Sequence, residues 1–296
     1  MNKKIITLIV LFPIFNFVIA DEIFKSENHS FSIETVVDEL EYPWSMEFTS
    51  DGKILITERP GRLRIFENGE LSAPIKGLPE IKVEGQGGLL DIALDSDFIN
   101  NKILFFSYSA GNLLGIGTEV SSAKLVNDEL NELKLLFKAL PKSRDGRHFG
   151  SRLLLTNDNS LYITLGDRGE MKRAQNINDH AGSLIRINKD GEIPKDNPFI
   201  KRSDAKAEIY TYGNRNIQGI ALNPVTYDIW TVEHGPQGGD ELNLMKPGIN
   251  YGWPVITYGV NYGTGTQIGE GTHKDGMAQP VYHWVPSIAT SSLLFY

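Results

Sequence analysis

A short β unit recurs along this chain and limits the folds that it can adopt. Each unit opens with a turn signal such as Asp51-Gly52, continues into a run of β-branched and aromatic residues, and then turns into a second such run. The units begin near residues 51, 100, 158 and 226, and long helical periodicity is nearly absent between them. Alternating apolar residues between turn signals are typical of β-hairpins, so the sequence predicts an all-β protein.

The spacing of the units narrows the choice of all-β architecture. Intervals of about 50 to 70 residues are typical of propeller blades that carry long loops, and in such repeats the loops gather on one face around a central axis. We therefore expect a functional site on that face. Residues 128–140 are the most ambiguous stretch and are predicted as strand. The alternative architecture is a β-sandwich, which needs no repeated internal unit.

The first twenty residues have the pattern of a secretory signal peptide. Two lysines precede an almost wholly apolar run over residues 5–18, and the cleavage site is expected after Ala20. The run is shorter than the ~20 residues that span a bilayer, and Pro13 and Asn16 interrupt it. We therefore expect a β-propeller domain over residues 21–296 that is periplasmic or secreted, with no stable membrane insertion.

Charge and cysteine content exclude several kinds of site. The 296-residue chain has a formal net charge of −8 and contains no cysteine. An acidic protein is a poor binder of nucleic acid, since phosphate contacts need a positive surface, and it is better suited to calcium and neutral sugars. Without cysteine there are no disulfides, although an oxidising compartment would permit them, and neither thiol catalysis nor cysteine-ligated zinc is available.

Four segments depart from simple strand-and-turn content, and each combines glycines with polar side chains. They are residues 84–91, 146–153, 213–219 and 233–241, the last of which runs on to residues 250–254. Glycines let a backbone approach a ligand closely, but they are equally common in plain turns. Gln86 in the first segment can both donate and accept hydrogen bonds. His148 in the second is flanked by glycines, although a lone histidine is more often structural than catalytic.

The last two segments offer charge and hard oxygen atoms. Arg215 presents a rigid fork for a carboxylate or a quinone oxygen, with amide side chains on both sides. Residues 233–241 combine carboxylates, amides and backbone carbonyls freed by glycine and proline, which suits calcium rather than zinc. A solvated arginine and a plain acidic turn remain the alternatives.

These segments, in this order, resemble the soluble PQQ-dependent aldose sugar dehydrogenases of the glucose/sorbosone dehydrogenase family. The resemblance runs from about residue 40 to residue 296 and includes further matches at residues 42–44, 57–62 and 165–169. It implies a six-bladed β-propeller that binds pyrroloquinoline quinone (PQQ) and calcium on the loop face. It also implies oxidation of aldose sugars to lactones, with electrons passed to a cytochrome or quinone. Because the chain stops inside what would be the fifth blade, we expect a truncated copy with about four blades and part of a fifth.

The resemblance also implies roles for individual residues. The proton acceptor would be His148. The residues in contact with PQQ would be Gln86, Arg215, Asn216 and Tyr262. The main-chain carbonyls of Gly235 and Pro236 would hold the calcium that bridges to the quinone, and Glu241 and Tyr251 would bind a second, structural calcium.

Elementary chemistry agrees with these implied roles. Oxidation at the anomeric carbon removes a hydroxyl proton together with a hydride. Neutral imidazole, with a pKa near ~6.5, can take the proton at ordinary pH. The quinone takes the hydride, calcium polarises the quinone carbonyl, and Arg215 stabilises the developing negative charge.

One departure from the family leaves a role open, and two other functions stay open beside the dehydrogenase. Arg147 stands where related glucose dehydrogenases carry an acidic residue, so the partner that orients His148 is not identified by the sequence. A calcium-dependent propeller lactonase would keep the calcium and the histidine without needing Gln86 or Arg215. A non-catalytic propeller that binds a partner or a glycan is the third possibility.

Overall fold

The structure, a computed structural model, describes residues 23–296, so the predicted signal peptide lies outside the described residues. Two units are distinguished, Met1–Asp38 and Glu39–Tyr296. The described part of the first contains a small antiparallel hairpin of β1 (Ile23–Lys25) and β2 (Ser30–Ser32). Among residues 23–296 we find no helix with the length and apolar character needed to cross a bilayer.

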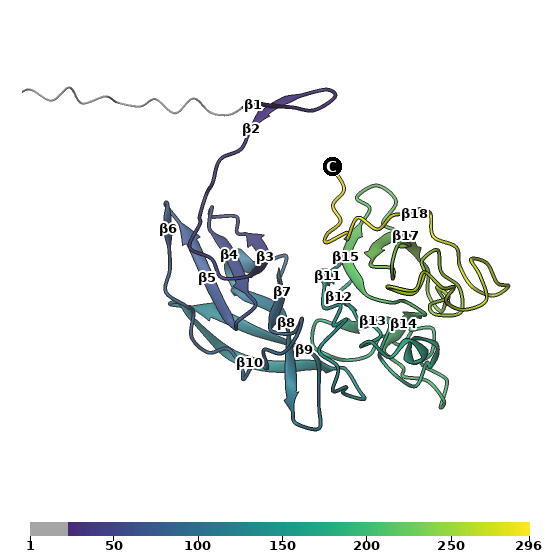
Figure 1. Cartoon of the computed structure of the whole chain (residues 1–296). Coiled ribbons are helices and arrows are strands. Elements are labelled where there is room, and N and C mark those ends of the chain that lie inside the picture. The colour runs from purple at the N-terminus through teal and green to yellow at the C-terminus, as the bar shows by residue number, and fades with distance from the viewer. Residues whose placement is uncertain (1–22) are drawn as a thin grey trace, which may run out of the picture. The chain divides into compact units, whose positions relative to one another are not determined.

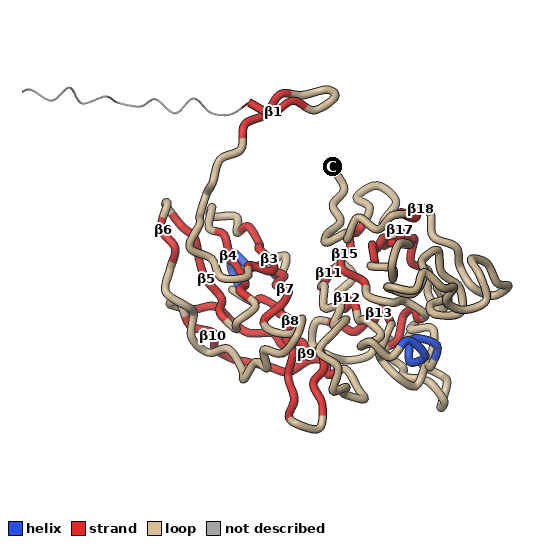
Figure 2. The backbone as a smooth tube through the Cα atoms, viewed as in Figure 1, coloured by secondary structure: helices blue, strands red, loops and turns tan. Residues whose placement is uncertain are grey.

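The second unit contains four antiparallel sheets of four strands each within its described residues, and each sheet uses strands that are consecutive in the chain (Figures 1 and 2). Blade 1 is β3 (Pro43–Phe48), β4 (Ile54–Glu58), β5 (Arg62–Glu67) and β6 (Glu70–Leu71). Blade 2 is β7 (Leu89–Leu94), β8 (Ile103–Asn112), β9 (Gly115–Val126) and β10 (Glu129–Lys138). Blade 3 is β11 (Leu153–Leu155), β12 (Ser160–Thr164), β13 (Ser183–Asn188) and β14 (Ile209–Tyr212). Blade 4 is β15 (Ile217–Leu222), β16 (Ile229–Glu233), β17 (Asp240–Met245) and β18 (Tyr282–Trp284). The helical elements are a short helix, α1 (Phe98–Asn101), and one 3-10 turn (Met171–Gln175).

The first strands of successive blades lie side by side. β3 contacts β7, β7 contacts β11, and β11 contacts β15, and Figure 1 shows these strands on the inner side of an arc of four sheets. This is a propeller arrangement, so the predicted all-β propeller is confirmed for four blades and the β-sandwich alternative is wrong. The sequence also predicted part of a fifth blade. Residues 285–296, which follow the fourth blade, contain no strand.

The repeated units predicted from sequence mark one position in each blade. The runs that begin after residues 51, 100, 158 and 226 are β4, β8, β12 and β16, the second strand of each sheet. The ambiguous residues 128–140 form β10, as predicted. Second strands lie inside their sheets, and their faces are covered where neighbouring blades pack against them. In β12, for example, all five residues are buried.

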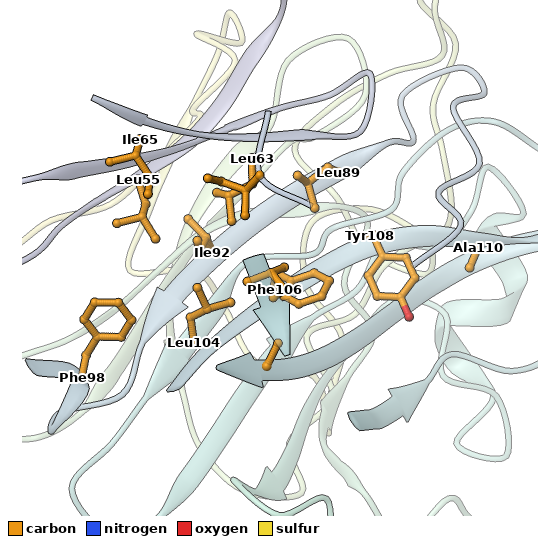
Figure 3. Close-up of a cluster of buried hydrophobic side chains, with 13 residues drawn as sticks. Leu55, Leu63, Ile65, Leu89, Ile92, Phe98, Leu104, Phe106, Tyr108 and Ala110 are labelled. Atoms are coloured by element: carbon orange, nitrogen blue, oxygen red, sulfur yellow. The ribbon is translucent and has the colours of Figure 1, made fainter. Parts of the chain in front are cut away.

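Apolar residues at alternate strand positions pack blade against blade. In β5, Leu63 and Ile65 are buried while the alternating Arg62 and Arg64 are partly exposed, as the twofold repeat of a strand requires. A core between blades 1 and 2 gathers side chains such as Leu55, Leu89 and Phe106 (Figure 3). Full burial of one such side chain stabilises the fold by about 1.5 to 3 kcal/mol. The sheets therefore form a rigid base for the loops at their ends.

The strand order decides which loops meet. In an up-and-down sheet, the chain enters the first strand at the same end where the second strand turns into the third. The segments at that end include residues 59–61, 72–88, 113–114, 139–152, 165–182, 213–216 and 234–239, as the strand bounds place them. Four of these segments carry predicted site residues, so most of those residues lie at one end of the blades, whereas Tyr251 and Tyr262 lie on the connection from β17 to β18.

Candidate active site

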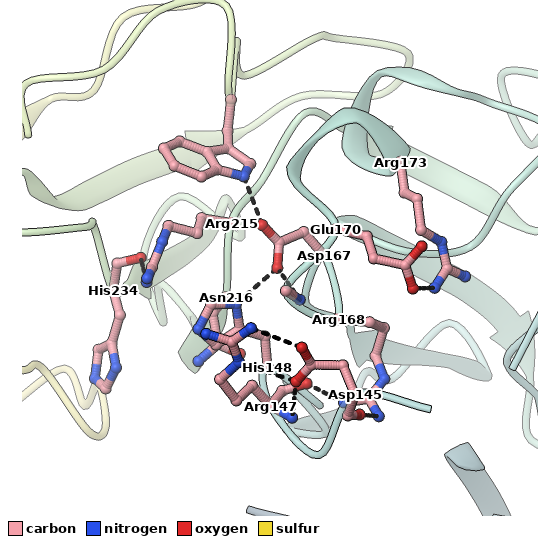
Figure 4. Close-up of polar contacts among 12 residues, drawn as sticks. Asp145, Arg147, His148, Asp167, Arg168, Glu170, Arg173, Arg215, Asn216 and His234 are labelled. Atoms are coloured by element: carbon pink, nitrogen blue, oxygen red, sulfur yellow. Dashed lines mark hydrogen bonds and ion pairs between the residues drawn. The ribbon is translucent and has the colours of Figure 1, made fainter. Parts of the chain in front are cut away.

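His148 occupies a constrained position in the loop between β10 and β11. Its backbone adopts a left-handed conformation, with φ of 53°. Its main-chain N–H donates to Gln86 Oε1 at 2.7 Å, and its ring Nδ1 lies 2.6 Å from Asp167 Oδ1 (Figure 4). Only 12% of the side chain is exposed. The loop thus fixes both the backbone and the ring of this histidine.

Asp167 fixes the tautomer of His148. The aspartate lies on the loop between β12 and β13, and its side chain is 1% exposed. It accepts three hydrogen bonds, from the His148 ring, from the Gly169 N–H at 2.8 Å and from Trp253 Nε1 at 2.7 Å. Because an ionised carboxylate only accepts hydrogen bonds, His148 Nδ1 must carry the proton, and the lone pair of Nε2 is left free. The imidazole is therefore arranged to act as a base through Nε2.

The orienting partner that the sequence left open is therefore Asp167. Arg147, the residue that departs from the family pattern, pairs instead with Asp145 at 2.6 Å. Asp167 lies in the matched stretch of residues 165–169, and Trp253 lies in the matched stretch of residues 250–254. Those stretches were recognisable signals, although neither residue was given a role.

The glycines of residues 84–91 serve a close contact between two loops. A Cβ on Gly85 would lie 2.3 Å from the carbonyl oxygen of Gly146, and the backbone there has φ of +57°. The Gln86 N–H donates to that same carbonyl at 2.7 Å. This approach brings the Gln86 side chain against His148, so the glycines position the site as well as turn the chain.

The loop of Arg215 and Asn216 is anchored by a buried carboxylate. The main-chain N–H groups of both residues donate to Glu233 Oε2, at 2.5 and 3.4 Å. The Arg215 guanidinium donates to the His234 carbonyl at 3.0 Å and lies 5.5 Å from the centre of the Trp253 ring. Burial lowers the pKa of Arg215 from its ordinary value. A partly desolvated cation here attracts an anion more strongly than one in water would.

Asn216 connects this loop to the loop of His148. The side chain is 3% exposed, and its Oδ1 accepts hydrogen bonds from the Gly150 N–H at 3.2 Å and from Gln218 Nε2 at 3.1 Å. Since its oxygen is already used, Nδ2 is the atom of Asn216 that can donate to a ligand. His148, Gln86, Arg215 and Asn216 thus belong to one connected network.

Two carboxylates lie together beneath Arg215. Burial raises the pKa of Glu233, and burial together with the Glu233 charge raises the pKa of Glu241 to about 8. Asn214 and Asn243 donate to Glu233 Oε1 at 2.7 and 3.2 Å. The Oδ1 atoms of both asparagines are buried without a hydrogen-bond partner. Carboxylates with unpaired amide oxygens form a donor set of the kind that calcium prefers, so the local chemistry fits a hard cation.

The structure brings most of the predicted residues to two cavities. A small one of about 10 Å³ is lined by Arg215, Gly235, Glu241 and Tyr251, together with Glu233, His234 and Trp253. A larger one of about 250 Å³ is lined by Gln86, Asn216 and His234, together with Arg59, Trp44 and Phe149. His234 lines both, so it is a further residue of the site that the sequence did not single out.

Three predicted residues do not line those cavities, namely His148, Tyr262 and Pro236, and the hydroxyl of Tyr251 is already used. Tyr262 is 67% exposed and lines neither cavity, and Pro236 packs against Gly259. The Tyr251 hydroxyl donates to the Leu244 carbonyl at 2.6 Å and accepts from the Lys246 N–H, which leaves its carbonyl for a metal. Across residues 23–296 no three His, Asp or Glu side chains converge as a metal cluster. A calcium here would rely largely on backbone and amide oxygens.

Comparison with known proteins agrees with this arrangement. The family model described as glucose / sorbosone dehydrogenase matches residues 40–296. The aldose sugar dehydrogenase of Escherichia coli is 43% identical over 272 residues, which cover 90% of this chain and 73% of the relative. The crystal structure of the apo form of the soluble E. coli aldose sugar dehydrogenase covers 88% of this chain and 76% of its own, with 42% identity and a TM-score of 0.85. The PQQ-bound aldose sugar dehydrogenase of Streptomyces coelicolor covers 85% of this chain and 70% of its own, with 26% identity and a TM-score of 0.72.

Proposed function

This chain belongs to the glucose/sorbosone dehydrogenase family, and we propose that it oxidises aldose sugars to lactones with PQQ as cofactor and calcium as a bound ion. Membership of the family supports an oxidoreductase that acts on sugars. The observation that carries the finer proposal is the His148–Asp167 pair, whose free Nε2 lies on the same loop network as Gln86, Arg215 and Asn216.

The residues present fit an anionic quinone cofactor. PQQ carries three carboxylates, and an acidic chain needs local cations and amides to hold it. Arg215 supplies a guanidinium at the smaller cavity, and Arg59 supplies one at the larger cavity beside Gln86 and Asn216. We propose that Gln86, Arg215, Asn216 and Tyr262 hold PQQ. Tyr262 is included because the resemblance to the family gives it this role.

The calcium proposal uses the donor set below Arg215. The carbonyls of Gly235 and Pro236 would hold one ion, and Glu241 with the carbonyl of Tyr251 would hold a second. The buried, unpaired oxygens of Asn214 and Asn243 support a cation at this place. When bound, PQQ supplies the hydride acceptor and the calcium ion polarises its quinone carbonyl.

The chain's own residues carry the proton chemistry. His148 Nε2 accepts the proton of the anomeric hydroxyl as the hydride leaves the sugar. Asp167 holds Nδ1–H, so the ring cannot turn away, and its charge stabilises the imidazolium that forms. Trp253 and the Gly169 N–H hold Asp167 in turn. Electrons would then pass to a cytochrome or quinone, in the periplasm or outside the cell if residues 1–20 direct export.

One titration separates the dehydrogenase from the other two functions. The purified protein is mixed with calcium and PQQ, and then with aldoses and a redox dye. We expect a thermal shift with PQQ and sugar-dependent dye reduction. A lactonase would hydrolyse lactones without PQQ, and a binding propeller would do neither. If PQQ produced neither a thermal shift nor an absorbance change, the dehydrogenase proposal would be lost for this chain.

A further inference from the structure

Arg168 is a buried arginine beside the site to which the proposed chemistry gives no role. The residue is 5% exposed. Its guanidinium donates to two main-chain carbonyls, those of Asp145 and Arg147, which precede His148 in the same loop (Figure 4). Its flat face lies 3.5 Å from the centre of the Phe149 ring, on the other side of the histidine. Arg168 therefore contacts the loop immediately before and immediately after His148.

Burying the charge of Arg168 is unfavourable, which indicates that its hydrogen bonds to the loop of His148 offset the cost. Burial lowers its pKa to about 10, so the side chain is still protonated at neutral pH. It forms no ion pair with a carboxylate within the described residues, because Asp145 pairs with Arg147, and its Nε is buried without a partner. Its charge is compensated by two carbonyl dipoles, an aromatic face and the nearby charge of Asp145, without a direct ion pair, and such burial is costly. A lysine could not reproduce the planar fork that reaches both carbonyls.

The loop that Arg168 holds would not keep its shape by local preference alone. His148 has φ of 53° and Ser151 has φ of 86°. Such left-handed conformations are unfavourable for residues with a side chain, and they persist only where surrounding contacts impose them. The carbonyl hydrogen bonds from Arg168 lie on the turn that contains this strain.

The short turn of residues 166–169 connects the base to the loop of Arg215. The Asp167 N–H donates to the Arg215 carbonyl at 2.8 Å, and Gly166 pairs with Asn216 in a β-bridge. In the same turn, the Asp167 side chain holds the ring of His148 and the Arg168 side chain holds its backbone. One rigid turn thus sets the base relative to the residues proposed to hold the cofactor.

We propose that Arg168 is a positioning residue, which fixes the main chain of residues 145–149 so that His148 stays against Asp167 with Nε2 directed at the substrate. This inference rests on the proposed function for the identity of the base. The claim that Arg168 holds this loop does not rest on the proposed function, because the contact between His148 and Asp167 can be observed without turnover.

The test uses Arg168→Met, which keeps much of the side-chain volume but removes the fork and the charge. The hydrogen-bonded Nδ1 proton of His148 should give a downfield proton NMR signal, assigned by its loss in His148→Gln. A second buried histidine, His180, lies 2.9 Å from Glu208 and gives a comparison signal, although it lines the same small cavity as Arg168. We expect Arg168→Met to lose or broaden the His148 signal and to keep that of His180.

Kinetics give a second readout that mere destabilisation would not produce. Misplacing a catalytic group by about 1 Å can cost on the order of a hundredfold in rate. We expect kcat of Arg168→Met to fall about 10- to 100-fold, while KM for the sugar and the affinity for PQQ stay within about threefold. Arg186→Met is the matched control, because Arg186 is a poorly exposed arginine of blade 3 that pairs with Asp158 and Asp196, away from the loop.

The outcomes are decisive in either direction. An unchanged His148 signal in folded Arg168→Met, or an equal loss of activity in Arg186→Met, would overturn the positioning role. If Arg168→Met does not fold, Arg168→Lys is measured by the same criteria, since it keeps the charge and loses only the fork. If the wild-type protein shows no sugar oxidation, the proposed function fails, while the NMR comparison still decides whether Arg168 holds the loop.

Discussion

At the scale of single residues, the sequence predicted His148 as the base that we propose, but not Asp167, the carboxylate that the structure places against its ring. His148 could be predicted because its flanking glycines and the family pattern mark it. Asp167 lies 19 residues further on, at the far end of a β-hairpin. Only the pairing of β11 with β12 brings the two together, and no spacing rule in the sequence encodes that contact.

The role of Asp167 can be tested by Asp167→Asn, which preserves shape but removes the charge. The amide can donate a hydrogen bond to Nδ1, which would then favour the tautomer that has its proton on Nε2. We expect turnover to fall by about a hundredfold or more, in line with the usual contribution of a general base, with PQQ affinity nearly unchanged. Steady-state kinetics and a PQQ titration measure both quantities. Full activity in Asp167→Asn would show that His148 does not depend on this carboxylate.

A second residue-scale prediction concerns stability and pH. Burial, with a contribution from the Asp91 charge, raises the pKa of Glu47 to about 7 from an ordinary value of 4.5. Between these values the folded chain keeps a proton that the unfolded chain has released, so the free energy of unfolding falls as pH rises. Glu47→Gln removes this dependence. We expect it to be more stable than wild type at pH 8, by on the order of 1 to 3 kcal/mol, and nearly equal at pH 4.

Denaturant unfolding at several pH values measures this difference. The sign of the difference in unfolding free energy between Glu47→Gln and wild type at pH 8 decides the test. A Glu47→Gln variant that is less stable than wild type at pH 8 would contradict the raised pKa.

At the scale of elements, the sequence predicted the positions of the second strands well, but it did not predict the conformations of the loops that carry the site residues. The runs around β4, β8, β12 and β16 carry dense apolar alternation between turn signals, so their period is easily recognised. The first strand β11 has only three residues, and the residues before it serve the site rather than the sheet. Loops are fixed by contacts with other loops, such as Gly85 with Gly146, and these contacts come from distant parts of the chain.

One glycine tests how closely these elements fit. Gly150 precedes β11 with φ of +63°, and a Cβ there would lie 2.6 Å from Leu165 Cα. We expect Gly150→Ala to destabilise the protein by about 2 kcal/mol or more, because strain and overlap add, and to lower turnover through His148. Gly52 is the matched control, since its φ is +90° but a Cβ would meet nothing within 4 Å. Thermal unfolding compares Gly150→Ala with Gly52→Ala. Equal losses of stability would show that the backbone shifts to remove the overlap at Gly150, which would contradict the prediction.

At the scale of the whole molecule, the sequence predicted a propeller from repetition, and the structure contains four blades. The repetition is visible in the sequence because each blade consists of four consecutive antiparallel strands with a similar apolar pattern. The number of six blades came from family resemblance, and the described residues show four. Most of the predicted site residues lie on loops at one end of the blades, as expected for a repeat with a central axis.

Calcium should act on the stability of the whole unit. An ion held by Glu241 and nearby carbonyls binds the folded chain alone, so at about a hundred times its dissociation constant it adds roughly 2.7 kcal/mol. We expect calcium to raise the melting temperature by several degrees, a chelator to reverse this, and Glu241→Gln to lose most of the effect. Magnesium serves as the control ion, because it demands a stricter octahedral site. A melting temperature that does not change when calcium is added would contradict the proposed calcium ligands.

The central claim is that His148 removes the sugar proton while bound PQQ takes the hydride. Rapid mixing of the PQQ- and calcium-loaded protein with an aldose, without any electron acceptor, tests it in a single turnover. We predict that the absorbance of oxidised PQQ is lost at a rate that rises with aldose concentration and slows when the anomeric carbon carries deuterium. His148→Ala should bind PQQ but leave that absorbance unchanged on the same timescale. Bound PQQ that is reduced equally fast in His148→Ala, or not reduced by any aldose in the wild type, would contradict the account.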